Sequence, residues 1–251
     1  MPTAGYNITW DVQGEHFFET GVDHCVLYVY DDSAATGKKY ANGVAWNGIT
    51  SVNEAPSGAD ANKMYADNIK YLNIYSAEEF GATIEAYTYP DEWAVCDGSA
   101  EPLTGMVLGQ QSRQMFGLCY RTKLGNDIKG DNLGYKLHLV YGCMASPSSR
   151  GYQSTNESPD AITFSWEINT TPVEVPVLVS GKEYKPTAII TLDSTKFTDS
   201  TSLEKWNALL TKLYGSTTGG GTGGDEPVPG YLPLPSEVFT TLGGTLPSSA
   251  S

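Results

Sequence analysis

Positively charged residues are scarce in this sequence. Its 251 residues include 15 lysines and arginines against 29 aspartates and glutamates, which gives a formal net charge of −14 at pH 7. Tight binding to nucleic-acid phosphates requires clustered lysine and arginine side chains, so this balance argues against such binding. A simpler interpretation of the acidity is solubility, because a net charge far from zero keeps protein molecules apart.

Long apolar runs are also missing. No stretch approaches the roughly 20 consecutive apolar residues of a membrane-spanning helix. The first 18 residues, MPTAGYNITWDVQGEHFF, lack the basic region and the apolar region of a secretory signal. We therefore expect a protein that does not associate with membranes and is made and kept soluble in a cytoplasm.

Residues that bind metals are few and poorly spaced. The histidines form no HxxxH or HExxH pattern, and the cysteines form no CxxC pair. In a reducing compartment, widely spaced cysteines are by default free thiols that are buried or half-buried. We expect no metal site, no cofactor and no disulfide framework. The residues concerned are His16, His24, His138, Cys25, Cys96, Cys119 and Cys143.

Catalytic patterns are absent as well. The sequence has no GxSxG element, and Ser146, Ser148 and Ser149 lie in a turn-like run. With 29 acidic residues some carboxylates must lie close together, and Glu85 and Glu167 are candidates on strands. Outward-facing acids on strands are more often solvated surface than acid–base pairs. We therefore expect that the chain is not an enzyme.

Aromatic residues, by contrast, are abundant. The chain has 16 tyrosines, 5 tryptophans and 7 phenylalanines beside 27 glycines and 14 prolines, a composition typical of strands joined by turns. Apolar and polar residues alternate with period two in 113–124, 135–144 and 161–169. In the first run Phe116 and Leu118 fall on one face and Arg121 on the other. These runs predict half-buried strands.

Further segments are rich in β-branched and aromatic residues and predict additional strands. The polar segments between them, 53–63, 125–134 and 145–160, predict turns and loops. Together the pattern predicts a mainly β fold, a sandwich or barrel of about eight strands. The additional strands are expected at 25–30, 43–52, 68–75, 82–89 and 186–192.

One amphipathic helix is expected near the end, over about 201–214. Thr201 and Glu204 have the spacing of a capping box, and an apolar stripe of helical period then runs to Gly215. A short helical turn is expected at 91–96, after Pro90. The expected organisation is a β domain with this flanking helix over 1–214, a glycine-rich linker over 215–226, and a C-terminal docking segment or tail over 227–251.

Several long motifs resemble a known family. The resemblance is to the major tail tube protein of siphophages and prophages of Gram-positive bacteria, and it runs from about residue 20 to residue 242. The motifs are YADNIKYLNIYSAEEFGATIEAYTYPDEWAVCDG (65–98), GQQSRQMFGLCYRTKLGND (109–127), GYKLHLVYG (134–142), SPDAITFSWEINTTPVEV (158–175) and LPLPSEV (232–238).

This resemblance implies a tube-protein fold of two packed sheets flanked by a helix. It implies a structural subunit of a phage virion, assembled in the cytoplasm of the bacterial host, whose hexameric rings stack into a conduit for genome passage. The implied partners are other copies of the chain, a tape measure protein, tail terminator and baseplate proteins, and double-stranded DNA in transit. Six copies would carry 6 × (−14) = −84 formal charges, and an acidic lumen would let DNA slide.

Subunit contacts are expected in three places. The first is the polar segment from Asn53 to Asp67, expected to be a loop that stacks one ring on the next. The others are the N-terminal segment 2–19 and the C-terminal segment 231–242, whose aromatics have no obvious partner within the chain. The candidate residues are Asn53, Glu54, Pro56, Asp60, Lys63, Tyr65, Asp67, Tyr6, Trp10, Phe17, Phe18, Tyr231 and Phe239.

Two other functions stay open at this point. Exposed tyrosines and tryptophans on a β-sandwich can stack on sugar rings, which would make the chain a carbohydrate- or surface-binding module of a virion. A hydrolase is the third possibility. Ring or tube formation would favour the first function, whereas glycan binding without polymerisation would favour the second.

Overall fold

A large antiparallel sheet organises the protein. The computed structural model describes residues 8–35, 37–148, 150–154, 160–179, 182–217 and 227–246. Within these residues eight strands form one sheet in the order β2-β1-β11-β12-β13-β8-β3, and β16 pairs with β12. The strands are β1 (Phe17–Val29), β2 (Val44–Ala45), β3 (Ile49–Glu54), β8 (Gly81–Ala86), β11 (Phe116–Asn126), β12 (Gly130–Ala145), β13 (Phe164–Thr170) and β16 (Ile189–Asp193).

The sheet divides into two layers at β12. Residues Lys136–Val140 of this strand pair with β16, whereas Cys143–Ala145 pair with β13. Beyond that division β13, β8 and β3 lie over β1 and β11, because side chains from both sets of strands share one buried cluster. The expected two layers are therefore two halves of a single sheet, and the mainly β fold with a flanking helix is confirmed.

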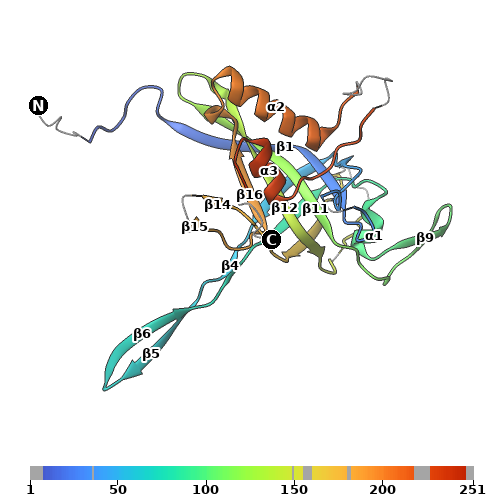
Figure 1. The fold of residues 1–251 in the computed structure, drawn as a ribbon. Coiled ribbons are helices and arrows are strands. Elements are labelled where there is room, and N and C mark those ends of the chain that lie inside the picture. The colour runs from blue at the N-terminus through green and yellow to red at the C-terminus, as the bar shows by residue number, and fades with distance from the viewer. Residues whose placement is uncertain are drawn as a thin grey trace, which may run out of the picture.

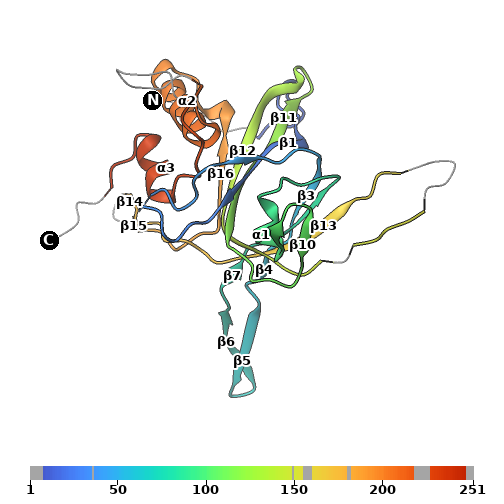
Figure 2. The same cartoon turned by 90° about the vertical axis from the view of Figure 1, so that its right-hand side faces the viewer.

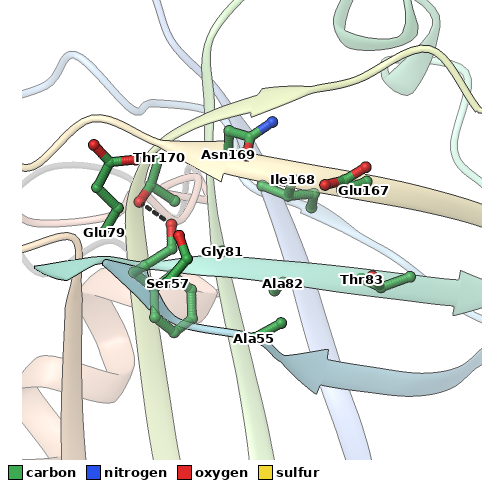
Figure 3. A pocket seen from close by; sticks show the side chains of 11 residues that line it. Ala55, Ser57, Glu79, Gly81, Ala82, Thr83, Glu167, Ile168, Asn169 and Thr170 are labelled. Carbon is green, nitrogen blue, oxygen red and sulfur yellow. Dashed lines mark hydrogen bonds between the residues drawn. The ribbon is translucent and has the colours of Figure 1, made fainter. Parts of the chain in front are cut away.

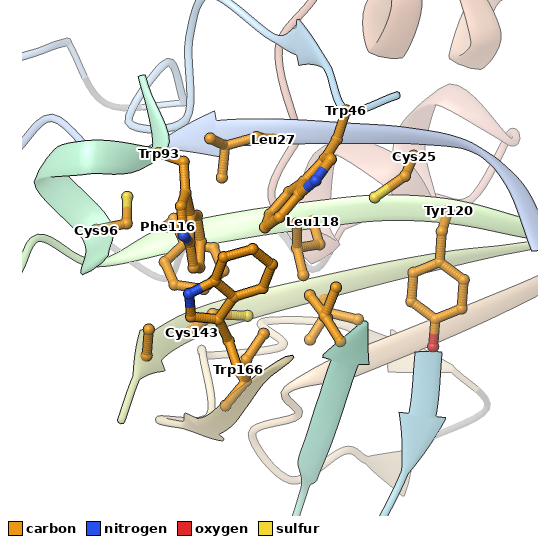
Figure 4. Packing of buried hydrophobic residues seen from close by; sticks show 14 of the residues in the cluster. Cys25, Leu27, Trp46, Trp93, Cys96, Phe116, Leu118, Tyr120, Cys143 and Trp166 are labelled. Carbon is orange, nitrogen blue, oxygen red and sulfur yellow. The ribbon is translucent and has the colours of Figure 1, made fainter. Parts of the chain in front are cut away.

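Three tryptophans fill the space between the layers (Figure 4). The ring of Trp93 lies 4.6 Å from that of Trp46 and 5.3 Å from that of Trp166, measured between centroids. Phe116 packs edge-on against Trp93 at 4.9 Å. Trp93 comes from α1 (Trp93–Asp97), so the short helical turn expected after Pro90 is confirmed, and its role is to insert this ring.

A second buried cluster covers the opposite face of β1, β11 and β12. Here α2 (Ser200–Tyr214) contributes Trp206, Leu209 and Leu213, and α3 (Pro235–Thr241) contributes Val238. The Tyr28 hydroxyl donates a hydrogen bond of 2.7 Å to the carbonyl of Leu213. The central strands are therefore buried on both faces, unlike the half-buried strands that the alternation predicted.

The flanking helix is confirmed, but its start is not. The N-cap is Asp199, whose side chain accepts from the backbone N–H of Ser202, so the Thr201–Glu204 capping box is wrong. Aspartate is a favoured N-cap residue because its carboxylate accepts a hydrogen bond from a free backbone N–H of the first helical turn. The helix ends at Gly215 as expected, with φ at 82°. Most of the expected linker, 218–226, lies outside the described residues.

Smaller hairpins project from this body (Figures 1 and 2). The longest extends downward in both views and pairs β5 with β6 and, nearer the body, β4 with β7. None of the described helices is long and apolar enough to cross a membrane. The hairpin strands are β4 (Ser57–Gly58), β5 (Ala61–Ala66), β6 (Ile69–Tyr75), β7 (Glu78–Glu79), β9 (Ala100–Leu103), β10 (Met106–Leu108), β14 (Leu178–Val179) and β15 (Lys182–Glu183).

Candidate assembly surface

The segment from Asn53 to Asp67 is not a loop. It comprises the end of β3, then β4 and β5, and it forms one arm of a hairpin whose other arm is β6 and β7. The turn at Asp67 and Asn68 has positive φ at both residues, 52° and 62°, as a two-residue hairpin turn of type I′ requires. The expectation of a loop failed because this arm is exposed on both faces, so its sequence does not alternate.

Apolar side chains cover the outer part of this hairpin, which we call the projecting hairpin (residues 57–79). Tyr71 is 69% exposed and Tyr65 is 68% exposed. An isolated two-stranded hairpin is only marginally stable in water, and contiguous exposed apolar side chains mark interaction sites. The projecting hairpin is therefore a candidate contact surface. The other exposed apolar residues on it are Met64, Ile69, Leu72, Ile74 and Tyr75.

The contact candidates on this arm are all accessible. Lys63 and Tyr65 lie on β5, and Asp60 precedes that strand. Asn53 and Glu54, at the end of β3, lie where the projecting hairpin leaves the body, and Pro56 follows them. The structure thus brings most of these candidates onto one element. Their role in subunit contacts stays a prediction.

A buried histidine anchors the root of the projecting hairpin. The ring of His138 stacks on Tyr120 with centroids 4.7 Å apart and planes 5° apart. The Tyr120 hydroxyl donates a hydrogen bond of 2.6 Å to Oε1 of Glu54. Nδ1 of His138 lies 3.4 Å from the same oxygen, and Nε2 lies 3.7 Å from Glu19. These contacts connect the last residue of β3 to β1, β11 and β12.

Burial decides the protonation of this network. It lowers the pKa of His138, and the carboxylates of Glu54 and Glu19 only partly oppose that effect. Burial also raises the pKa of Tyr120, as does its hydrogen bond to Glu54. Burial acts to raise the pKa of Glu19, but hydrogen bonds from Lys136 and Thr122 outweigh this effect and hold the pKa below its usual value. At neutral pH His138 is therefore uncharged.

The sequence pattern does not predict that this histidine is buried. Alternation along 135–144 places His138 with Lys136 on a polar face, yet the residue is only 7% exposed. The error arises because β12 is covered on both sides, so the face opposite the α2 cluster is also interior. A histidine that alternates with leucines on a strand carries no signal that would separate a buried face from an exposed one.

The contact candidates in the N-terminal and C-terminal segments differ in how far they are exposed. Trp10 and Phe17 are 77% and 65% exposed on the N-terminal segment, and Phe18 is 45% exposed. Tyr6 lies outside the described residues. Tyr231 does have a partner within the chain, contrary to the reason for choosing it, and segment 231–242 packs on α2 and on the central sheet through Leu232 and Val238. Phe239 lies on α3 in the same segment and is partly exposed. The Tyr231 hydroxyl donates to Glu237 at 2.5 Å.

A pocket with acidic lining lies at the root of the projecting hairpin (Figure 3). This pocket has a volume of about 170 Å³, and Glu79 and Glu167 lie at its opposite ends. Thr170 donates a hydrogen bond of 2.6 Å to the carbonyl of Phe80 between them. Within the described part of the chain, no group of three or more histidine, cysteine or acidic side chains could hold a metal ion.

No protein-family model matches the chain, and no curated protein matches it. Among solved structures, this chain matches a chain of the sheath-tube complex of an extracellular contractile injection system, PVC, in its extended state. That chain has a TM-score of 0.29 and 12% identity over 68% of this chain and 88% of its own length. A chain of the sheath/tube terminator structure of the same system has a TM-score of 0.28 and 11% identity, over 74% of this chain and 99% of its own length. At this identity the similarity does not assign a role.

Proposed function

We propose that the chain is the structural subunit of a phage tail tube and not an enzyme. Its copies close into hexameric rings, and the rings stack into a conduit for genome passage into the host. The observation that carries this proposal is the projecting hairpin, whose exposed tyrosines and aliphatic side chains form a two-stranded element without further sheet partners among the described residues. The family resemblance of segments 65–98 and 109–127 supports the same role.

Self-association gives this hairpin the partner that it lacks in a monomer. Leu72 and Met64 pair across β5 and β6, and Ile74 lies two residues further along the same face. Tyr71 and Tyr75 alternate with them on β6 and belong to the other face. Both faces of the hairpin therefore carry apolar groups, and a contact between stacked rings would bury both.

The remaining parts of the proposal follow from this assembly. The tube belongs to the virion of a siphophage and is assembled in the host cytoplasm, where it meets a tape measure protein, a tail terminator and baseplate proteins. Double-stranded DNA passes through without sequence-specific contacts. The formal charge of −14 per chain suits this passage, because acidic walls do not offer phosphates the lysine and arginine contacts that would hold them.

Removing the projecting hairpin tests the proposal. The backbone N–H of Ala55 donates to the carbonyl of Gly81 at 2.8 Å, so the two ends of the hairpin lie close together. Replacing 57–79 by an Asn-Gly turn should therefore leave the body folded. We expect the full chain to form tubes in negative-stain micrographs and the shortened chain to form no tubes, with unchanged cooperative unfolding. Tubes formed by the shortened chain would refute the role of the hairpin.

A carbohydrate- or surface-binding module is the second candidate. The specific observation in its favour is the exposure of Tyr65, Tyr71 and Tyr75 on one element, since tyrosine rings can stack on sugars. The same preparation separates the two functions. Binding to a glycan array by a chain that remains monomeric at all concentrations would favour this second function.

A further inference from the structure

A second and smaller hairpin projects beside α1. Strands β9 and β10 pair Leu103 with Met106 and Ala100 with Leu108, and Gly105 in the turn has φ at 80°. Leu103 is 67% exposed and Val107 is 64% exposed. Within the described residues these strands join no other sheet. An apolar two-stranded hairpin of this kind is marginal in water and indicates a contact with another surface.

An apolar groove lies between α3, β16 and the segment that leads into β14. Its volume is about 260 Å³. Because a cavity of about 150 Å³ holds a benzene molecule, this groove has room for one or two aliphatic side chains. Val179 and Tyr184 stand at it and are 38% and 46% exposed. Other residues that line the groove are Val177, Ile190, Leu192 and Phe239.

The hairpin and the groove lie on nearly opposite sides of the molecule. In Figure 1 the β9–β10 hairpin extends to the right, whereas β14 and β15 lie to the left. In Figure 2 β14, β15 and α3 again lie to one side, away from β10. The projecting hairpin points downward in both views, so the β9–β10 hairpin extends in a separate, sideways direction. One chain cannot fill its own groove with this hairpin.

The charges at the two places are complementary. Glu101 lies on β9, whereas Lys182, Glu183 and Lys185 surround Tyr184 at the groove and together carry 2 − 1 = +1 formal charge. The ammonium group of Lys182 lies 5.5 Å from the centre of the Tyr184 ring. In a chain with 15 basic residues against 29 acidic ones, a local excess of positive charge beside an apolar groove favours an acidic and apolar partner.

We propose that the β9–β10 hairpin of one copy inserts into the groove of a second copy. The contact is head-to-tail, with different surfaces on the two partners, and such contacts produce rings when the rotation closes. This inference rests on the proposed self-assembly and deepens it: the projecting hairpin joins one ring to the next, and the β9–β10 hairpin joins neighbours within a ring.

Disulfide trapping tests this contact. The four native cysteines are 0 to 4% exposed, so introduced thiols react selectively. We expect the full chain carrying Val107→Cys and Val179→Cys to give, on mild oxidation, a ladder of covalent oligomers in a denaturing gel. A control chain carrying Val107→Cys and Asn207→Cys places the second thiol on the exposed face of α2 and should give no ladder.

The outcomes separate this inference from the proposed function. Rings or tubes in micrographs without a ladder would overturn the hairpin-in-groove contact and leave the tube proposal standing. A chain that forms neither ring nor ladder would contradict both. Two single variants, each with one new cysteine, provide the last check. Mixed before oxidation, they should give a covalent dimer that neither gives alone, and a disulfide confined to one chain would refute the proposal.

Discussion

Truncating one tyrosine of the projecting hairpin should weaken assembly without weakening the fold. Tyr71 is 69% exposed, so Tyr71→Ala removes little that the monomer buries. A buried aromatic side chain covers about 150 to 250 Å², and at about 25 cal/mol per Å² the exposed part of this one represents about 3 kcal/mol in a contact. Alanine retains part of that area, so we expect a loss of about 2 to 3 kcal/mol, which corresponds to a roughly 30- to 150-fold rise in the critical concentration for assembly.

Sedimentation at a series of protein concentrations measures that critical concentration. A matched control is Tyr87→Ala, because Tyr87 is 54% exposed but lies on the body after β8. The two variants should have the thermal unfolding midpoint of the parent chain. An unchanged critical concentration for Tyr71→Ala, or an equal rise for both variants, would refute the reasoning that places the contact on the hairpin.

Three further predictions concern the body. Because the folded-state pKa of His138 lies below its ordinary value of 6.5, the unfolded chain binds a proton that the folded chain does not, and stability should fall as the pH drops from about 6.5 through that folded pKa. His138→Gln should remove this pH dependence from the unfolding free energy measured with urea. The variant should keep the loss of stability at lower pH that Glu19 and Asp23 cause below their ordinary pKa values. A parent chain whose unfolding free energy does not change below pH 6.5 would contradict the assignment to His138. Leu209→Ala, at a fully buried position on α2, should lower the unfolding free energy by about 2 to 5 kcal/mol. The control Asn207→Ala, on the exposed face of the same helix, should lower it little. Equal losses for the two variants would contradict the packing of α2. Burial raises the pKa of Cys96 and Cys119 to about 12, so a thiol reagent at pH 8 should label none of the four cysteines until the chain unfolds, and rapid native labelling would be inconsistent with this core.

Alternation in the sequence predicted the central strands well. Run 113–124 became β11, and run 135–144 became the second half of β12. It did not predict that these strands are covered on both sides, because a polar residue such as His138 can be interior when a carboxylate and a tyrosine meet it there. A period of two in the sequence predicts a strand. Which segments cover the two faces of that strand depends on contacts between residues far apart in the chain.

The secondary structure of the candidate contact segment was not predicted. The sequence predicts a loop over 53–67, whereas the structure pairs 61–66 with 69–75 in a hairpin whose strands have no buried face. The β9–β10 hairpin was missed altogether, although Thr104 and Gly105 between apolar residues are a turn signal. Helix α3 was missed because it is short and begins at Pro235 within a proline-rich segment. Each of these elements takes its shape from pairing or docking and not from a periodic sequence.

The central claim is that this chain assembles with itself. The most direct measurement is negative-stain microscopy of the purified full chain over a range of concentrations. We expect annuli with sixfold symmetry that stack into tubes as the concentration rises. Compact monomers at every concentration, without annuli or tubes, would contradict the account.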